Sequence, residues 1–327
     1  MPSEIRDHPV FICGHPKSGT SLLRSLLDSH PQLVVYPEES VFFRRYRQRT
    51  AGLSLTEKLN AAERYLLHIF TWNQENPLES QAGFPDRDYS AIPYDAVQDA
   101  FREIALPESI RHDGDILAAA VLAFGRVTGQ WTDAARHWVE KSPYNEQFAA
   151  QIFAWWPEAK CIHVVRDPQD NHVSYRRKHP DWQPEFFAHN WRRSTQQGFA
   201  NRQRYGDARY WLLRFEDLLR NPEETLEILC RFLAIDSAPE LSQPSRAGET
   251  WAGNSMFGQR FDSISQKPIG RWRESLEAPD AAVIETIDGA LMEKLSYPLV
   301  SGRPLAARWR ALTWPLRQRW AAIKKRK

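Results

Sequence analysis

The sequence predicts an α/β fold whose parallel sheet is covered by helices on both faces. Short apolar runs that read as strands alternate along the chain with segments of helical periodicity, an order typical of parallel sheets. The strand runs are nearly continuous in apolar residues, as in Cys161-Ile162-His163-Val164-Val165, and do not alternate between apolar and polar. Strands of that kind are buried on both sides, so helices are expected above and below the sheet.

Four strands and four helices follow one another in this pattern. The strands are predicted at residues 10–13, 137–140, 160–165 and 210–215. The helix after each strand is predicted at residues 21–29, 144–156, 168–178 and 222–233. Leucines at helical spacing support the first helix, and a proline at the first helical position supports the third and the fourth.

A helix-rich segment separates the first strand from the second. It runs from about residue 53 to residue 130, and the stretch 85–93, which contains proline and aspartate, breaks it. No internal repeat or low-complexity tract marks a linker. We therefore expect one domain over residues 1–300 that contains this helical insertion, followed by a helical C-terminal extension over residues 301–327.

The composition is that of a globular chain with a sizeable core. The 327 residues are 42% hydrophobic, and the net charge of +2 is too small to indicate a nucleic-acid partner. Cys13, Cys161 and Cys230 lie in apolar runs without a CxxC pair or a histidine at ligand spacing, which disfavours a disulfide or a zinc site. The N-terminus lacks an apolar signal core, and no stretch reaches the ~20 apolar residues that span a bilayer. We expect a soluble, cytoplasmic protein.

The loop after the first strand has the composition of a phosphate-binding loop. It reads GHPKSGTS over residues 14–21 and opens a helix whose unpaired N–H groups and dipole favour an anion. Gly19 lets the backbone approach a ligand closely, and Lys17 supplies a mobile positive charge. Further donors are the hydroxyls of Ser18, Thr20 and Ser21. The alternative is an ordinary helix start with a serine or threonine cap.

The order of residues in this loop differs from that of nucleoside-triphosphate hydrolases. Their pattern G-x-x-x-x-G-K-[ST] places lysine after the last glycine, whereas Lys17 precedes Gly19. This order disfavours a nucleotide kinase or a GTP-binding switch, although both stay as alternatives. Dependence on magnesium would distinguish them.

A second anion site is predicted at the end of the third strand. Arg166 ends that strand, and Asp167-Pro168 is a favourable helix opening with a capping carboxylate. Ser174 comes about two helical turns later and faces the same crevice if the helix docks on the sheet. A guanidinium and a hydroxyl together bind a phosphate. The alternative is that Arg166 pairs with a carboxylate and Ser174 faces solvent.

Together the two sites resemble those of the sulfotransferases that use 3′-phosphoadenosine 5′-phosphosulfate (PAPS). The segment PKSGTS over residues 16–21, a leucine-rich helix and DSHP over residues 28–31 are similar to that family's 5′-phosphosulfate loop. Arg166-Asp167-Pro168 with Ser174 is similar to its 3′-phosphate site. The resemblance implies a P-loop-NTPase-like sheet and a PAPS-dependent enzyme. A protein that binds the product adenosine 3′,5′-bisphosphate (PAP) without catalysis stays as an alternative.

Two later segments resemble nucleotide-contacting parts of the same family. The segment LRFEDL over residues 213–218 is similar to its Tyr-Glu-Asp-Leu segment, with Phe215 in place of the tyrosine. This change removes a hydroxyl contact with the adenine but keeps a ring for stacking. The segment KPIGRWR over residues 267–273 is similar to the part that folds over the 3′-phosphate, although it departs from the Arg-Lys-Gly form. It implies Lys267 and Arg271 as contacts.

Sulfuryl transfer needs a base that takes the acceptor's proton and cations beside the leaving phosphate. The segment YPEESVFF over residues 36–43 resembles the glutamate segment of carbohydrate sulfotransferases, which implies Glu39 as the base and Glu38 as its rival. Two solvated carboxylates that open a helix are the alternative. Three histidines also stay open as bases: His68, His112 and His137.

Lys141 follows the second predicted strand within EKSP, residues 140–143. This segment resembles the family's Glu-Lys-Thr/Ser-Pro, which implies that Lys141 contacts the sulfuryl group or the acceptor. A surface lysine in a turn is the alternative. Because lysines and helix N-termini supply positive charge, we expect no metal.

The C-terminal residues 307–327 are basic and carry Trp309, Trp314 and Trp320. Such a stretch can lie on an anionic membrane surface, and the alternative is a helix that packs its tryptophans on the core and that Pro315 kinks. The acceptor is expected to be a hydroxyl on a carbohydrate or a lipid-linked glycan, since the glutamate base resembles those families. Other tryptophans either stack on sugars or fill the core: Trp155, Trp156, Trp182 and Trp191.

Overall fold

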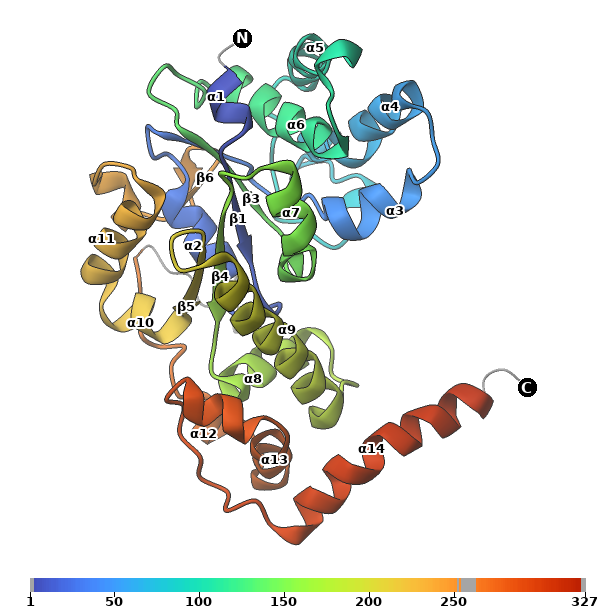
Figure 1. Ribbon diagram of the computed structural model, residues 1–327, viewed down its shortest axis with the longest axis vertical. Helices are drawn as coiled ribbons and strands as arrows, with labels where there is room; N and C mark the ends of the chain where they lie inside the picture. Colours follow the sequence, from blue (N-terminus) through green and yellow to red (C-terminus); the bar gives the residue numbers. More distant parts are fainter. Residues whose placement is uncertain (1–2, 252, 254–262, 325–327) are drawn as a thin grey trace.

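A five-stranded parallel sheet forms the centre of the protein (Figure 1). The computed structural model describes residues 3–251, 253 and 263–324, with the backbone alone at residues 3–4 and 315–324. The strand order is β2-β3-β1-β4-β5, and all neighbours are parallel, so the carboxyl ends meet at one edge. The strands are β1 (Pro9–Cys13), β2 (Leu33–Val35), β3 (His137–Lys141), β4 (Lys160–Val165) and β5 (Tyr210–Arg214). A separate antiparallel pair consists of β6 (Ser245–Arg246) and β7 (Glu249–Thr250).

The predicted α/β class and the four predicted strands are confirmed. The sequence pattern missed β2, which is three residues long and too short to show a strand periodicity. The predicted helices correspond to α2 (Thr20–Leu27), η5 (Asn145–Phe148) with α7 (Ala149–Trp155), α8 (Pro168–Lys178) and α11 (Pro222–Leu233).

Helices cover both faces of the sheet. On one face, α2, α10 (Phe215–Arg220) and α11 pack against Val10 and Ile12 of β1. On the other face, α6 (Asp113–Val127) and α7 pack in a core that contains Phe11 of the same strand. Neighbouring residues of one strand therefore enter two different cores, which explains why the strand is apolar throughout.

The helical insertion lies between β2 and β3. It begins with η1 (Phe42–Tyr46), a π-helix, and ends with α6. The alanine-rich sequence of α6 is buried along nearly its whole length. Its helices therefore begin before residue 53, where the sequence pattern placed the start. Between these two lie α3 (Arg47–Arg49), α4 (Leu55–Tyr65), η2 (His68–Thr71), η3 (Glu79–Gln81), α5 (Tyr94–Ile104) and η4 (Pro107–Ser109).

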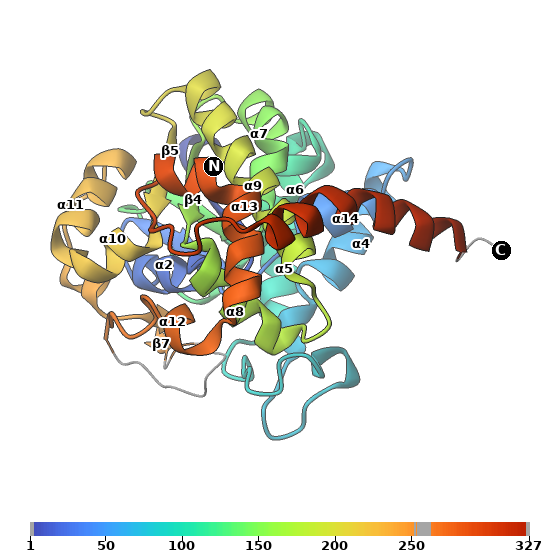
Figure 2. The same cartoon turned by 90° about the horizontal axis from the view of Figure 1, so that it is seen from below.

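A third core lies beyond the carboxyl end of β4. It joins α8 to α9 (Pro184–Tyr205) and α13 (Ala278–Lys294) through residues such as Trp191 and Ile284. The last helix, α14 (Leu305–Lys324), touches this core at Ala307 and then extends away from the rest of the molecule (Figures 1 and 2). It continues as a helix through Pro315, and the kink predicted at this proline stays a prediction. The remaining short helices are α1 (Ser3–Arg6), η6 (Pro239–Ser242) and α12 (Trp272–Ser275).

Helices that cross a bilayer contain about 20 mostly apolar residues. No helix within residues 3–251 and 263–324 combines the length and the apolar character needed to cross a membrane.

Candidate active site

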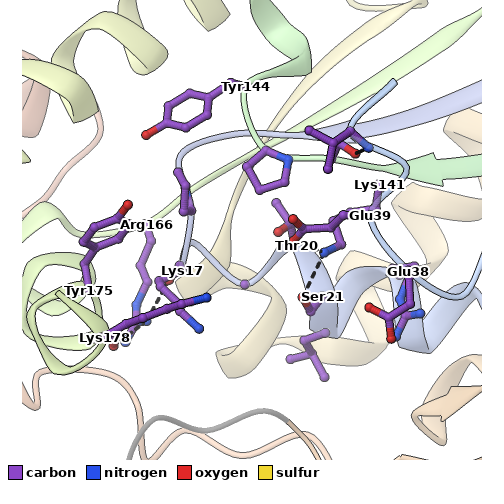
Figure 3. Close-up of a pocket in the computed structure, with 18 of the residues that line it drawn as sticks. Lys17, Thr20, Ser21, Glu38, Glu39, Lys141, Tyr144, Arg166, Tyr175 and Lys178 are labelled. Atoms are coloured by element: carbon purple, nitrogen blue, oxygen red, sulfur yellow. Dashed lines mark hydrogen bonds and ion pairs between the residues drawn. The ribbon is translucent and has the colours of Figure 1, made fainter. Parts of the chain in front are cut away.

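A cavity of about 830 Å³ lies at the carboxyl edge of the sheet (Figure 3). It brings together most of the residues that the sequence singled out, although they come from six separate segments. Those that line it are Lys17, Gly19, Thr20, Ser21, Glu38, Glu39, Lys141, Arg166, Ser174, Phe215 and Arg271. Two predicted residues do not line it: Ser18 is a buried residue of the first loop, and Lys267 is exposed.

The loop between β1 and α2 is held in a conformation that few residues other than glycine adopt. Gly19 has φ +98°, and a Cβ atom there would lie 2.1 Å from the ring of Phe215. Asn171 on α8 fastens the loop from below, because its amide donates to the Pro16 carbonyl at 3.2 Å and to the Ser18 hydroxyl at 3.0 Å. Ser18 thus supports the loop, and its predicted contact with the nucleotide stays a prediction.

Lys17 extends from this loop beside Lys178 of α8 (Figure 3). Burial and the neighbouring charge of Lys178 lower the pKa of Lys17 to about 8, although Glu39 opposes this shift. A lysine in these surroundings gains stability when an anion binds beside it, because the anion offsets both the lost hydration and the repulsion.

The second predicted anion site assembles as the sequence indicated. The Arg166 guanidinium donates to the Ser174 hydroxyl at 3.1 Å and to the Lys17 carbonyl at 3.0 Å, so it links this site to the first loop. Its guanidinium carbon lies 5.2 Å from the Phe215 ring centre. Phe215 is buried between Gly19 and Arg166, which makes it a spacer between the two loops as well as part of the cavity wall.

The late segment reaches the cavity because α8 holds its backbone. Asp170 accepts from the backbone N–H of Gly270 at 2.7 Å and of Trp272 at 2.9 Å, which places Arg271 at the cavity. Burial and the nearby Arg166 charge lower the pKa of Arg271. The role predicted for exposed Lys267 stays a prediction.

The two adjacent glutamates have different surroundings. Glu39 keeps 42% of its side chain exposed and forms a 2.6 Å ion pair with Lys141. The partial loss of hydration raises the pKa of Glu39, but the charges of Lys141 and Lys17 outweigh this effect, so the pKa is lowered overall. Glu38 is set apart from it (Figure 3) and accepts from Tyr89 at 2.7 Å while pairing with Arg87 at 3.3 Å.

The end of β3 supports the Glu39 loop. Lys141 also donates to the Ser21 hydroxyl at 3.2 Å and so joins this loop to the start of α2. The neighbouring Glu140 is fully buried and accepts from the Ser40 hydroxyl at 2.6 Å and from the Asn145 amide at 2.7 Å. Glu140 therefore ties the residue next to Glu39 to the sheet edge.

Three cavity residues other than glycine have a left-handed backbone: Lys17 with φ 66°, Val41 with φ 48° and Tyr144 with φ 69°. This conformation is unfavourable, most of all for a β-branched residue such as Val41. It persists where the surrounding structure holds it, as when Val41 donates its N–H to the Ser142 hydroxyl at 3.0 Å. Such strain is typical of active sites.

Several lining residues were not predicted from the sequence. They come from α2, α8, α9, η1 and the residue before η5, and include cations and aromatic rings: Arg24, Arg44, Arg45, Tyr144, Tyr175, Lys178, Phe186 and Arg193. A weak signal existed in the helical spacing of Phe186, Asn190 and Arg193, which places them on one face of α9. Nothing in the sequence indicated what that face contacts.

The histidines considered as bases and the tryptophans considered for sugar stacking differ in whether they line the cavity. His68 lines the cavity, whereas His112 stacks on Trp155 at 5.0 Å and His137 lies between two backbone carbonyls. Of the four tryptophans considered for sugar stacking, Trp182 lines the cavity, while Trp156 and Trp191 are fully buried in the cores.

A buried polar cluster lies below the first loop. Cys13, Glu146 and His163 place three potential metal-ligand atoms within 4.8 Å of one another. Hydrogen bonds within the protein already engage them: Glu146 accepts from the Gly14 N–H at 3.1 Å, and the Tyr210 hydroxyl lies 2.9 Å from His163. Burial raises the pKa of Glu146 to about 7. These contacts are those of a structural network that supports Gly14.

Comparison with known proteins agrees with this geometry. A family model described as "Sulfotransferase family" matches residues 9–239. The sulfotransferase domain of the Synechococcus PCC 7002 olefin synthase is 23% identical, with a TM-score of 0.53, and the match covers 90% of this chain and 96% of that one. The sulfotransferase domain from the curacin biosynthetic pathway is 20% identical, with a TM-score of 0.53, and the match covers 90% of this chain and 99% of that one. Both likenesses show a shared fold.

Proposed function

The chain belongs to the sulfotransferase family of PAPS-dependent enzymes, and on that premise we propose that it moves a sulfuryl group to an acceptor hydroxyl with Glu39 as the general base. Family membership decides against the three alternatives, which were a nucleotide kinase, a GTP-binding switch and a protein that binds PAP without catalysis. The observation that carries the proposal is the contrast between the two glutamates that line the cavity. Glu39 keeps 42% of its side chain exposed, whereas Glu38 is 11% exposed and is held by Tyr89 and Arg87.

The proposed step is a single in-line displacement. The acceptor oxygen attacks the sulfur, the bond from sulfur to the bridging phosphate oxygen breaks, the acceptor's proton passes to Glu39, and PAP leaves. Because cations keep the pKa of Glu39 low, its carboxylate is ionised at neutral pH and accepts hydrogen bonds from a hydroxyl. Lys141 fixes the orientation of this carboxylate.

Cations in the cavity are suited to the charge that develops on the leaving group. We propose that Lys17, with Ser21 and the N-terminus of α2, binds the 5′-phosphosulfate. We propose that Arg166, Ser174 and Arg271 bind the 3′-phosphate, and that the wall at Phe215 contacts the nucleotide. With these contacts, protein groups would neutralise the negative charge that develops on the leaving PAP.

The acceptor that we propose is a hydroxyl on a carbohydrate or a lipid-linked glycan. An aromatic wall of the same cavity supports this class, because Tyr144, Tyr175 and Trp182 offer ring faces on which a sugar can stack.

We also propose that α14 contacts an anionic membrane surface. Residues 301–327 contain nine lysines and arginines and no acidic residue, and Trp309 is 67% exposed.

The test of the base is Glu39→Gln, with Glu38→Gln as the matched control on the neighbouring residue. Glu39→Gln should lower kcat by about 10²- to 10⁴-fold, while PAP affinity stays within about threefold. Sulfate transfer from labelled PAPS is measured against glycans, glycolipids and phenols, and PAP affinity by calorimetry. Full turnover in Glu39→Gln would reject this residue as the base, and a larger loss in Glu38→Gln would assign the role to its neighbour.

A further inference from the structure

The cavity carries a charge imbalance that the rest of the chain does not share. The whole chain has 43 lysines and arginines against 41 aspartates and glutamates. Among the described residues that line the cavity, ten are lysine or arginine and two are glutamate. A charge surplus concentrated in one cavity of a nearly neutral protein indicates anionic ligands.

The nucleotide accounts for part of this surplus. A phosphate monoester such as the 3′-phosphate carries about −1.5 to −2 at pH 7, and the phosphosulfate adds about two more charges. Lys17, Arg166 and Arg271 are assigned to these groups, and Arg87 and Lys141 pair with the two glutamates. Five cations then remain: Arg24, Arg44, Arg45, Lys178 and Arg193.

The remaining cations have no carboxylate neighbour at ion-pair distance within the part of the chain that the structure describes. Arg44 instead lies 4.6 Å above the Tyr144 ring, and Lys178 lies 5.7 Å from the Phe84 ring centre. Arg24 is 97% buried, since only 3% of it is exposed, and its Nε and Nη1 have no hydrogen-bond partner among the described residues. Buried guanidinium atoms without a hydrogen-bond partner are costly, so a partner from outside the described residues is expected.

Arg44 and Arg193 line the cavity from elements that carry none of the residues assigned to the nucleotide. Arg44 belongs to η1, shortly after Glu39, and Arg193 belongs to the α9 face that also carries Phe186 and Asn190. These elements are separate from the two loops assigned to the nucleotide. Aromatic rings line the cavity beside α9, where the Trp182 ring centre lies 4.4 Å from that of Phe186 and 4.5 Å from that of Tyr175.

We propose that the acceptor is an anion, with a carboxylate or phosphate that Arg44 and Arg193 bind and a ring that lies on the aromatic wall. This inference rests on the proposed function and narrows its acceptor class. An anionic group bound there would place a neighbouring hydroxyl of the same molecule toward Glu39. Arginine suits this task, because its planar guanidinium binds a carboxylate or phosphate with two hydrogen bonds.

The experiment titrates matched compounds into the enzyme saturated with PAP and measures binding by calorimetry. One pair is phenyl β-D-glucuronide and phenyl β-D-glucoside, which differ by a carboxylate, and the other is glucose 6-phosphate and glucose. The anionic member of a pair should bind at least about tenfold more tightly, and added salt should reduce the difference. In Arg44→Gln/Arg193→Gln the two members should bind within about twofold of each other.

The control is Arg204→Gln, which removes an exposed arginine from the same α9 helix outside the cavity and should keep the preference. Unchanged PAP affinity in the double variant shows that it is folded, and Arg193→Gln alone should show an intermediate preference. Equal affinity within both pairs, or no binding of either member while PAP binds, would overturn the anionic acceptor and leave the sulfotransferase assignment standing. Failure of PAP to bind the wild type would overturn both.

Discussion

Lys17 and Glu39 show how the cavity sets the charge of its own residues. Burial and Lys178 lower the pKa of Lys17 to about 8, whereas the cations around Glu39 outweigh its burial and keep the pKa of that carboxyl low. Both groups are therefore charged at neutral pH. The lysine can bind an anion and the carboxylate can take a proton, although they lie in the same cavity.

The lowered pKa of Lys17 predicts how PAP affinity depends on pH. Free Lys17 loses its proton as the pH rises through about 8, and the phosphates of PAP favour the charged form, so binding takes up a proton above that pH. Wild-type affinity should then fall by up to about tenfold per pH unit. Lys17→Arg should show a flat profile, since arginine stays charged. Calorimetry between about pH 6.5 and 9.5 checks this, and a flat wild-type profile would show that Lys17 does not titrate there.

Several of the residues that could be predicted share one property, which is a distinctive side chain at or shortly after the carboxyl end of a strand. Lys141 ends β3, Arg166 directly follows β4, and Lys17 lies in the loop after β1. Parallel strands bring these ends together without further information. Arg44 and Arg193 could not be predicted, because their place in the cavity depends on how η1 and α9 pack over the edge. An arginine on a helix surface has no sequence signal that separates a cavity wall from solvent.

At the scale of elements, the cavity depends on hydrogen bonds that fasten loops to the sheet and to α8. Asn171 and Asp170 on α8 hold the first loop and the late segment, and Glu140 at the end of β3 holds the loop that carries Glu39. Glu140 was part of a recognised segment, yet its role was not predicted. A buried carboxylate that accepts from three neighbours is visible only when the neighbours are in place.

Glu140→Ala should therefore affect catalysis more than nucleotide binding. It leaves the donors of Ser40, Ser142 and Asn145 without their acceptor, which costs about 1–3 kcal/mol for each buried donor that stays unpaired. The midpoint of urea unfolding should fall, and kcat should fall at least about tenfold because Glu39 loses its support. PAP affinity should stay within about threefold, since no Glu140 contact reaches Arg166 or Lys17.

Glu103→Ala on α5 is the matched control, because that glutamate is 72% exposed. This replacement should leave the midpoint of urea unfolding and kcat unchanged. Activity is measured well below the unfolding temperature of each variant. A stability loss without a change in kcat would show that Glu140 supports the fold but does not position Glu39.

At the scale of the whole molecule, the C-terminal third was the least predictable part. The pattern of strands and helices indicated the sheet, but not that α8, α9 and α13 would form a core of their own beyond its edge. That core fixes the base of α14, where Arg310 pairs with Glu185 at 2.8 Å and Trp314 stacks on His189 at 4.8 Å. One tryptophan of the extension therefore packs on the body as expected, while Trp309 does not. Trp320, whose side chain is not described, and residues 325–327 lie outside the part that tests this expectation.

The exposed face of α14 leads to the prediction about membranes. Leu305, Trp309 and Leu312 are 80%, 67% and 73% exposed and recur at helical spacing, so they share one face of a helix that extends from the body (Figure 2). Burying a leucine or tryptophan stabilises binding by about 1.5–3 kcal/mol per side chain, and each basic residue near an anionic surface adds about 1 kcal/mol. Co-sedimentation should detect binding to phosphatidylcholine vesicles that contain about 30% phosphatidylserine, and weaker binding without that lipid or at high salt.

Trp309→Ala/Leu312→Ala should weaken vesicle binding at least about tenfold, because both changes remove apolar area from the face that would enter the interface. Leu78→Ala/Leu106→Ala is the matched control, since each of these leucines is 46% exposed on the body, and it should bind like the wild type. Turnover of a water-soluble acceptor should be the same in all three proteins, as Trp309 and Leu312 do not line the cavity. A lipid-independent dimer that the α14 variant abolishes would assign this face to a second copy of the chain, and equal vesicle binding by both variants would exclude it as the membrane contact.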